Sequence, residues 1–153
     1  MFDILLRGGV VIALTAGAYF LTRMLLARFA LPLLRRSRPA WAAPVERSRL
    51  LMLTALLAAV LTLGVALGLL AYGYPQLTEL VRLLDTAVGI GILALMLSTM
   101  ASIGLAIYEQ QPLAKEVPLK GFVQLIQGGI FLIGALMIVA VFLGVPALYS
   151  FAA

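Results

Sequence analysis

The chain has 153 residues, of which 64% are hydrophobic and 11% charged, with a net charge of +5 and neither Cys nor His. Soluble domains average about 45–50% apolar and about 25% charged residues, so this composition excludes a soluble globule and favours a membrane protein. Without Cys and His there are no thiolate nucleophiles, disulfides, imidazole bases or typical transition-metal sites, and we expect no enzyme, metal or cofactor. The basic residues lie beside apolar stretches, which predicts lipid headgroups rather than nucleic acid as their partner.

Four apolar stretches reach the length of about 20 residues that a helix needs to cross a bilayer. They predict an all-α fold, in which residues 1–153 form a single transmembrane domain: an integral membrane bundle of four transmembrane helices. The expected spans are 8–27, 50–72, 84–108 and 121–144. Helix-breaking residues lie between the spans and after the last one: Pro32, Pro39, Pro44, Gly73, Pro75, Pro112, Pro118, Gly144 and Pro146. We expect short loops at these positions.

The first stretch also has features of a secretory signal, namely Arg7 before the apolar run and Ala16-Gly17-Ala18 as a cleavage-site mimic. The apolar run continues past Ala18, and arginines follow it. We therefore expect this segment to remain in the protein as a membrane helix.

Basic residues are concentrated in the first and third connections and their flanks: Arg23, Arg28, Arg35, Arg36, Arg38, Arg47, Arg49, Lys115 and Lys120. The opposite side has only Arg7 and Arg82. The positive-inside rule places the first group in the cytoplasm and both chain ends outside, in a bacterial inner (plasma) membrane. Within the first connection, Arg35, Arg36, Arg38 and Trp41 are expected to anchor the loop at the headgroups.

Small residues recur at four-residue spacing in the middle spans, as Gly64 with Gly68 and Ser98 with Ser102. Such pairs allow helices to approach closely. Packing within the chain is favoured over a dedicated dimer surface.

Glu79, Arg82 and Asp85 lie three residues apart at the outer start of the third helix, where they can pair along one face. A proton or cation relay is the alternative. Water at the interface screens such charges, and we expect no ionisable residue in mid-membrane, which argues against a coupled transporter.

Gln124 and Gln127 are one turn apart in the fourth span and share a helix face. They are either a polar lining or switchable contact, or static hydrogen bonds between helices. We favour static hydrogen bonds, each of which contributes about 0.6–2 kcal/mol to the association of helices in membranes.

The run VPLKGFVQ at 117–124, preceded by Tyr108 and followed by a helix that ends LGVP at 143–146, resembles a stretch of MscS-like mechanosensitive channels. The similarity is to the branch with extra N-terminal helices, which has a P-[IL]-K-G-[YF]-x-Q run before the helix that precedes the pore helix. The Arg-rich loop with Trp41 and Glu46-Arg47 is also similar. The chain departs from that pattern at Gln127, where a basic residue is common, and at Ala42 and Ala43, where acidic residues are common.

The resemblance implies a membrane-tension channel that forms a homo-oligomer, a heptamer in this family, with membrane lipids as partners of its outer sensor helices. The family's pore helix and cytoplasmic domain would follow Pro146. The expected function is therefore a tension-sensing module that does not conduct ions without that pore helix. The alternatives are a non-conducting scaffold or accessory subunit and a small oligomeric transporter.

The resemblance also directs attention to Pro118, Lys120 and Gly121, where the third connection enters the fourth helix. Gly tolerates backbone angles that other residues resist, so Gly121 is a candidate hinge and Lys120 a candidate headgroup contact. A plain helix start with a snorkelling lysine is the alternative.

Overall fold

The protein is helical throughout the parts that the computed structural model describes, which are residues 2–71, 74–112 and 119–144, with side chains from Leu6 onward. The elements are α1 (Phe2–Leu25), the π-helical segment η1 (Leu26–Ala30), α2 (Leu31–Ser37), α3 (Pro39–Arg47), α4 (Leu50–Leu70), α5 (Pro75–Tyr108) and α6 (Lys120–Phe142). Four helical stretches are long and apolar enough to cross a membrane: Leu6–Ser37, Leu50–Leu70, Pro75–Tyr108 and Lys120–Phe142. This confirms the all-α class with four candidate spans, a multi-pass membrane protein.

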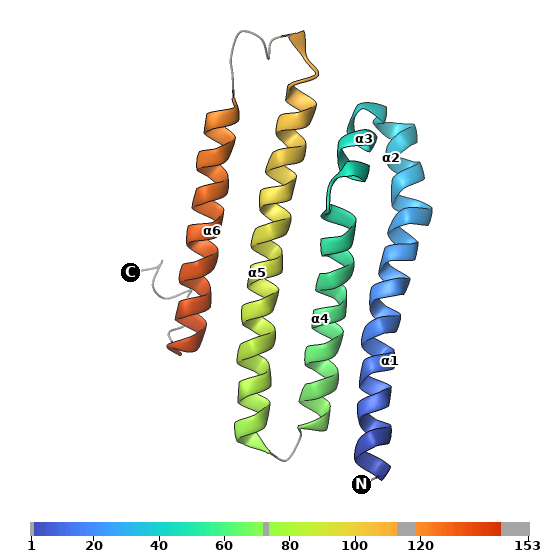
Figure 1. Cartoon of the computed structure of the whole chain (residues 1–153), viewed down its shortest axis with the longest axis vertical. Coiled ribbons are helices and arrows are strands. Elements are labelled where there is room, and N and C mark those ends of the chain that lie inside the picture. The colour runs from blue at the N-terminus through green and yellow to red at the C-terminus, as the bar shows by residue number, and fades with distance from the viewer. Residues whose placement is uncertain (1, 72–73, 113–118, 145–153) are drawn as a thin grey trace.

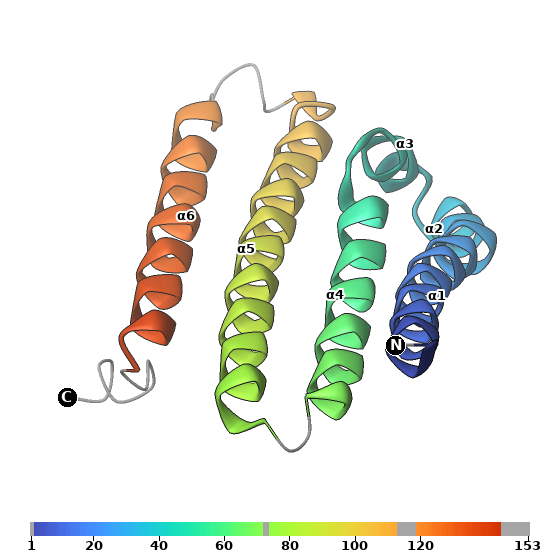
Figure 2. The ribbon, with the colours of Figure 1, turned by 60° about the horizontal axis from the view of Figure 1, so that its bottom comes forward.

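The four long helices lie side by side in one row, in the same order in space as in sequence (Figure 1). α1 packs against α4, α4 against α5, and α5 against α6, and the short α3 contacts α4 and α5. A second view shows the same order (Figure 2). The term bundle is thus refined: each of the two inner long helices packs against only two other long helices, with α3 as a further contact, and most of their remaining surface is open.

The open faces leave an unusually large surface. The accessible area is 11031 Å², whereas a compact soluble protein of 16.3 kDa exposes about 7500 Å². Many large apolar side chains are exposed on every long helix, among them Ile12, Val65, Leu97 and Leu132. In lipid this exposure carries no penalty, because acyl chains are as apolar as leucine.

Small side chains dominate the seams between helices. The buried apolar residues of the described chain are Val11, Ala42, Leu53, Ala55, Ala59, Ala71, Ile92, Ala94 and Ile103. At the α5–α6 seam, a Cβ added to the buried Gly134 would lie 3.2 Å from the Ala94 Cβ. The helices therefore approach closely at points where both side chains are small.

The first connection differs from the prediction of loops at its prolines. Pro32 lies in the first turn of α2, where its missing N–H is tolerated, and the helical path runs through η1 to Ser37, well past the expected span end at 27. In a regular α-helix the ring of Pro32 would clash with the carbonyl group four residues earlier. The wider π-helical turn before Pro32 makes room for the ring. The path instead turns at Arg38 (φ −146°) and at Ser48 (φ −80°, ψ 164°), on either side of α3.

Prolines begin helices elsewhere too. Pro39 starts α3, and Pro44 lies inside that helix without ending it. Pro75 starts α5, nine residues before the expected span at 84, because a proline at a helix start loses no hydrogen bond. Gly144 follows α6 with a φ of +67°, a left-handed end that favours glycine. The expected break at Pro118 lies outside the described residues.

The arrangement puts the start of α1 and the end of α6 at the same end of the row as the α4–α5 connection (Figure 1). The Arg-rich α2 and α3 lie at the other end (Figure 1). Because the first and last described residues lie at the same end of the row, they are on the same side of the membrane if all four helices cross it. Which end faces the cytoplasm remains the prediction of the positive-inside rule.

Cysteine labelling tests that orientation, since the natural chain has no cysteine. Arg36→Cys, at an exposed site of α2, should react with a membrane-impermeant maleimide only from the cytoplasmic face. Gln76→Cys, exposed in the first turn of α5, is the matched control and should react only from outside. The reverse pattern would contradict the orientation.

Candidate functional site

One hydrogen-bonded contact and one close steric approach join α5 to its neighbours, and together they form the candidate site. One lies in the α5–α6 seam and the other in the α4–α5 seam. In lipid, polar contacts and close packing are what hold helices together, so these positions decide how the row is held.

The α5–α6 contact is made by Gln127. Its Nε2 donates to the Ser98 carbonyl oxygen at 3.0 Å and to the Ser102 Oγ at 2.7 Å. The Ser98–Ser102 pair, predicted from its spacing to aid packing, thus also provides the acceptors for the glutamine. Gln124 is exposed, and its side chain makes no hydrogen bond to the described residues.

The α4–α5 contact joins Gly64 to Asp85. A Cβ added to Gly64 would overlap the Asp85 carboxyl group, whereas one added to Gly68 meets nothing within 4 Å. Of the predicted GxxxG pair, only Gly64 is therefore needed for close approach. The rest of this contact is an apolar hollow of about 230 Å³, with walls that include Val60, Leu67 and Val88.

The depth of Asp85 follows from its partner. Gly64 lies six residues before the end of α4 at Leu70, which corresponds to about 9 Å along the helix axis. The α4 sequence from Leu50 to Leu70 has no charged residue. Asp85 therefore lies against the uncharged length of α4 rather than at the end of that helix.

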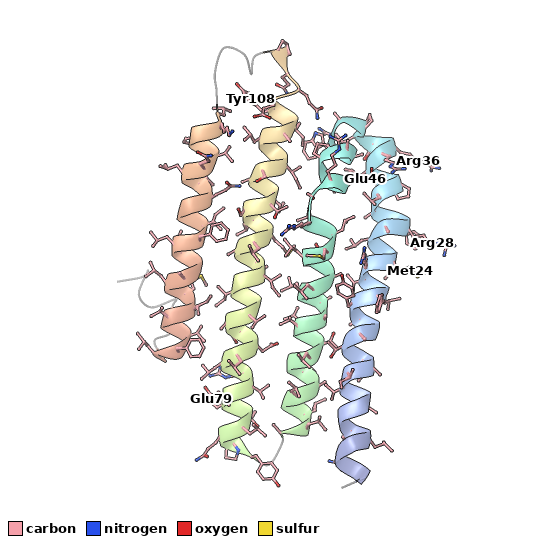
Figure 3. The ribbon with its side chains drawn as sticks, viewed as in Figure 1. Met24, Arg28, Arg36, Glu46, Glu79 and Tyr108 are labelled. Atoms are coloured by element: carbon pink, nitrogen blue, oxygen red, sulfur yellow. The ribbon has the colours of Figure 1, made fainter. Side chains whose placement is uncertain are left out.

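The other two members of the predicted charged triplet pair with each other. Arg82 Nη2 lies 2.7 Å from Glu79 Oε1 and its Nε 3.1 Å from Glu79 Oε2, with both side chains more than half exposed. Figure 3 shows Glu79 at the far end of α5 from Tyr108. An exposed ion pair of this kind contributes about 0–1 kcal/mol to the free energy of unfolding. Asp85 is not part of it.

Sequence reasoning could have identified from helical spacing that Asp85 lies on an apolar face of α5. Asp85 stands four residues after Val81 and three before Val88, so it shares a helix face with two apolar residues that line the same hollow. That spacing shows which face the carboxylate occupies. It does not show that Gly64 stands opposite.

The candidate hinge lies at the start of α6, which begins at Lys120. Both Lys120 and Gly121 are exposed. A Cβ on Gly121 would meet nothing within 4 Å, and its φ is not positive, so this arrangement does not itself require glycine there. Pro118, the third residue of the predicted hinge, lies outside the described part of the chain.

The predicted anchor residues lie around α2 and α3. Arg35 forms an ion pair with Glu46 that joins the two helices, and the Arg38 guanidinium carbon lies 5.4 Å from the centre of the Trp41 ring. Trp41 is 43% exposed. Figure 3 shows Arg36, like Arg28, pointing away from the row. This end of the row is therefore rich in exposed charge.

Among the described residues, no group of three His, Cys, Asp or Glu side chains is arranged to hold a metal ion. Comparisons with family models, with curated proteins and with solved structures gave no match. The resemblance to MscS-like channels therefore depends on the short run at 117–124 and on the other sequence features noted with it.

Alanine substitution tests the close approach at Gly64. Gly64→Ala and Gly68→Ala gain the same helix propensity of about 1 kcal/mol, but only the first adds a methyl group against Asp85. We expect Gly64→Ala to be less stable than Gly68→Ala by about 1–3 kcal/mol in detergent unfolding followed by circular dichroism. Adding Asp85→Ala should remove the difference. Equal effects of the two alanines would show that Gly64 is not in close contact.

Leucine substitution tests the hydrogen bonds of Gln127. Gln127→Leu removes both hydrogen bonds to α5 and should lower the free energy of unfolding by about 0.6–2 kcal/mol. Gln124→Leu is the control, since it makes the same chemical change at an exposed position. If the two variants unfold alike, the α5–α6 hydrogen bonds contribute nothing to stability.

Proposed function

We propose that the chain is a membrane-tension-sensing transmembrane module of an ion channel similar to the MscS-like family. The observation that carries this proposal is the single row of helices, apolar and open on both faces. A module of this shape has a large lipid-contacting area for its mass. Forces in the bilayer therefore act directly on each helix.

Tension favours whichever arrangement of the helices has the larger in-plane area, and a protein responds if two arrangements differ little in free energy. The described seams suit such a response. They are built from small residues, with one interhelical hydrogen-bonded group at α5–α6 and one carboxylate against glycine at α4–α5. Packing of this kind lets one helix slide or tilt against the next without exposing buried charge.

The proposal includes orientation and assembly. The Arg-rich connections lie in the cytoplasm, both chain ends lie outside, and the membrane is the bacterial inner membrane, as the charge distribution favours. Copies assemble as a homo-oligomer, a heptamer by the resemblance. The open apolar faces of the row leave surface for neighbouring copies as well as for lipid.

A change in the distance between α1 and α6 under tension is the expected result of the tension-sensing proposal. Spin labels at Leu14→Cys in α1 and Leu136→Cys in α6, both exposed positions, report the width of the row. Lysophosphatidylcholine added to one leaflet of vesicles imposes asymmetric stress. We expect the label distance to shift by about 5 Å, the size of a one-turn helix displacement.

The control pair is Leu125→Cys, within α6, with Leu143→Cys, directly after its last residue, and their separation should not change. Adding Gly121→Val to the first pair tests the hinge and should reduce the shift, because a branched residue stiffens the helix start. Gly128→Val, at another open position of α6, should leave it unchanged. No shift in the first pair would contradict tension sensing and favour the scaffold or accessory subunit.

A transporter is the second candidate, and one observation favours it: the Asp85 carboxyl reaches about 9 Å into the apolar length of α4. Ionisable residues within membranes commonly mark ion pathways. If vesicles containing the protein dissipate a proton gradient without applied tension, and Asp85→Asn abolishes this, transport is the better description. An intact gradient favours the sensor.

A further inference from the structure

A polar hollow of about 520 Å³ lies where α3 turns into α4 and faces α5. Its walls come from two separate parts of the chain. Residues between 43 and 49 form one wall, and the other is formed by the last turns of α5 from Ser98 together with Glu109 and Gln110 just after its end. It shares Ser98 and Ser102 with the α5–α6 contact, but neither the predicted sites nor the proposed sensor function assigns it a ligand.

Two arginines in the first wall have no polar partner in the part of the chain that the structure describes. The side chains of Arg47 and Arg49 are exposed and make no hydrogen bond or ion pair with the residues that the structure describes. Other arginines nearby are engaged, since Arg35 is paired with Glu46 and Arg38 stacks on Trp41. The cations lining the hollow are therefore available for an anionic ligand.

Ser48 holds these arginines in position. Its Oγ donates to the Val45 carbonyl at 2.7 Å and accepts the Leu50 N–H at 3.3 Å, which fixes the turn between α3 and α4. The opposite wall contributes Glu109, the one carboxylate in the lining. Positive charge thus exceeds negative charge in the hollow, two groups against one.

The hollow changes character with depth. From Glu109 to Ser98 the wall extends eleven residues along α5, about 16 Å. The charged groups lie near the helix ends. Further in, the wall consists of hydroxyl and apolar side chains, among them Ser102, Ile103 and Ala106. This gradient from charged to apolar matches a glycerophospholipid, with its phosphate at the surface, its esters below and its acyl chains in the membrane.

We propose that this hollow binds the headgroup of an anionic phospholipid, with its phosphate at Arg47 and Arg49. The site also reaches α6, because Ser98 and Ser102 line the hollow and accept the Gln127 hydrogen bonds. A bound lipid would therefore touch the α3–α4 turn and the residues that hold α6 to α5. The inference requires membrane embedding but not tension sensing, so the two proposals can fail separately.

The test is lipid retention by the purified full chain in detergent, measured by native mass spectrometry. Phosphatidylglycerol is compared with phosphatidylcholine of the same acyl chains, and we expect preferential retention of the anionic lipid. Each arginine near an anionic headgroup changes affinity by roughly fivefold, so Arg47→Gln with Arg49→Gln should weaken retention by about 30-fold. Circular dichroism confirms that helix content is unchanged.

The matched control is Arg23→Gln with Arg28→Gln, which removes the same charge at exposed sites that do not line the hollow. Arg28 points away from the row (Figure 3). The control variant should keep the preference for phosphatidylglycerol. A second variant, Ala106→Phe, fills the inner part of the hollow, leaves both arginines in place and should also lose retention.

Three results would overturn the proposal. The first is that the natural chain shows no preference for the anionic lipid. The second is that both arginine pairs lose the preference equally, which indicates non-specific surface charge. The third is that millimolar inorganic phosphate displaces the lipid completely, which indicates a site for the free ion. If tension moves the helices but any of these results holds, the sensor proposal stands without the lipid site.

Discussion

Close approach between helices, rather than burial of apolar surface, is the constraint on which this structure depends. Each long helix satisfies its own backbone hydrogen bonds, and lipid is as good a solvent for leucine as another helix is. Association must then come from packing of small residues and from polar contacts. The described seams fit this expectation, with alanine prominent among the buried residues, hydrogen bonds from Gln127, and close packing of Asp85 against Gly64.

This constraint explains why the helices form a row. A soluble four-helix protein must close around a core to remove apolar surface from water, and its helices acquire partners on several sides. Here no such force acts, and a helix needs only the neighbours that its small residues fit. Each long helix packs against the next long helix in the chain, so chain order is also spatial order. The resulting open faces suit both proposed roles, since they expose the helices to bilayer forces and leave the hollow beside Arg47 and Arg49 accessible to lipid.

The sequence predicted the helices well because hydropathy over about 20 residues is a local property. It could not predict that Pro32 lies inside a continuous helical path, because that depends on the π-helical turn before it. It predicted Ser98 with Ser102 and Gln124 with Gln127 as pairs, but which glutamine meets the serines depends on how α6 is rotated. The contact of Asp85 with Gly64 and the hollow beside Arg47 join residues far apart in sequence, and their register is set by the α3 turn and the α4–α5 connection.

The central claim is that lipid surrounds the open faces of the row, and spin-label accessibility tests it most directly. Single cysteines replace Ile12, Val65, Leu97 and Leu132, one exposed apolar residue in each long helix. In reconstituted vesicles, the labels should collide with oxygen, which concentrates in acyl chains, far more often than with a water-soluble nickel chelate. More frequent collisions with the chelate at these positions would mean that water, not lipid, contacts the row, and would contradict the account.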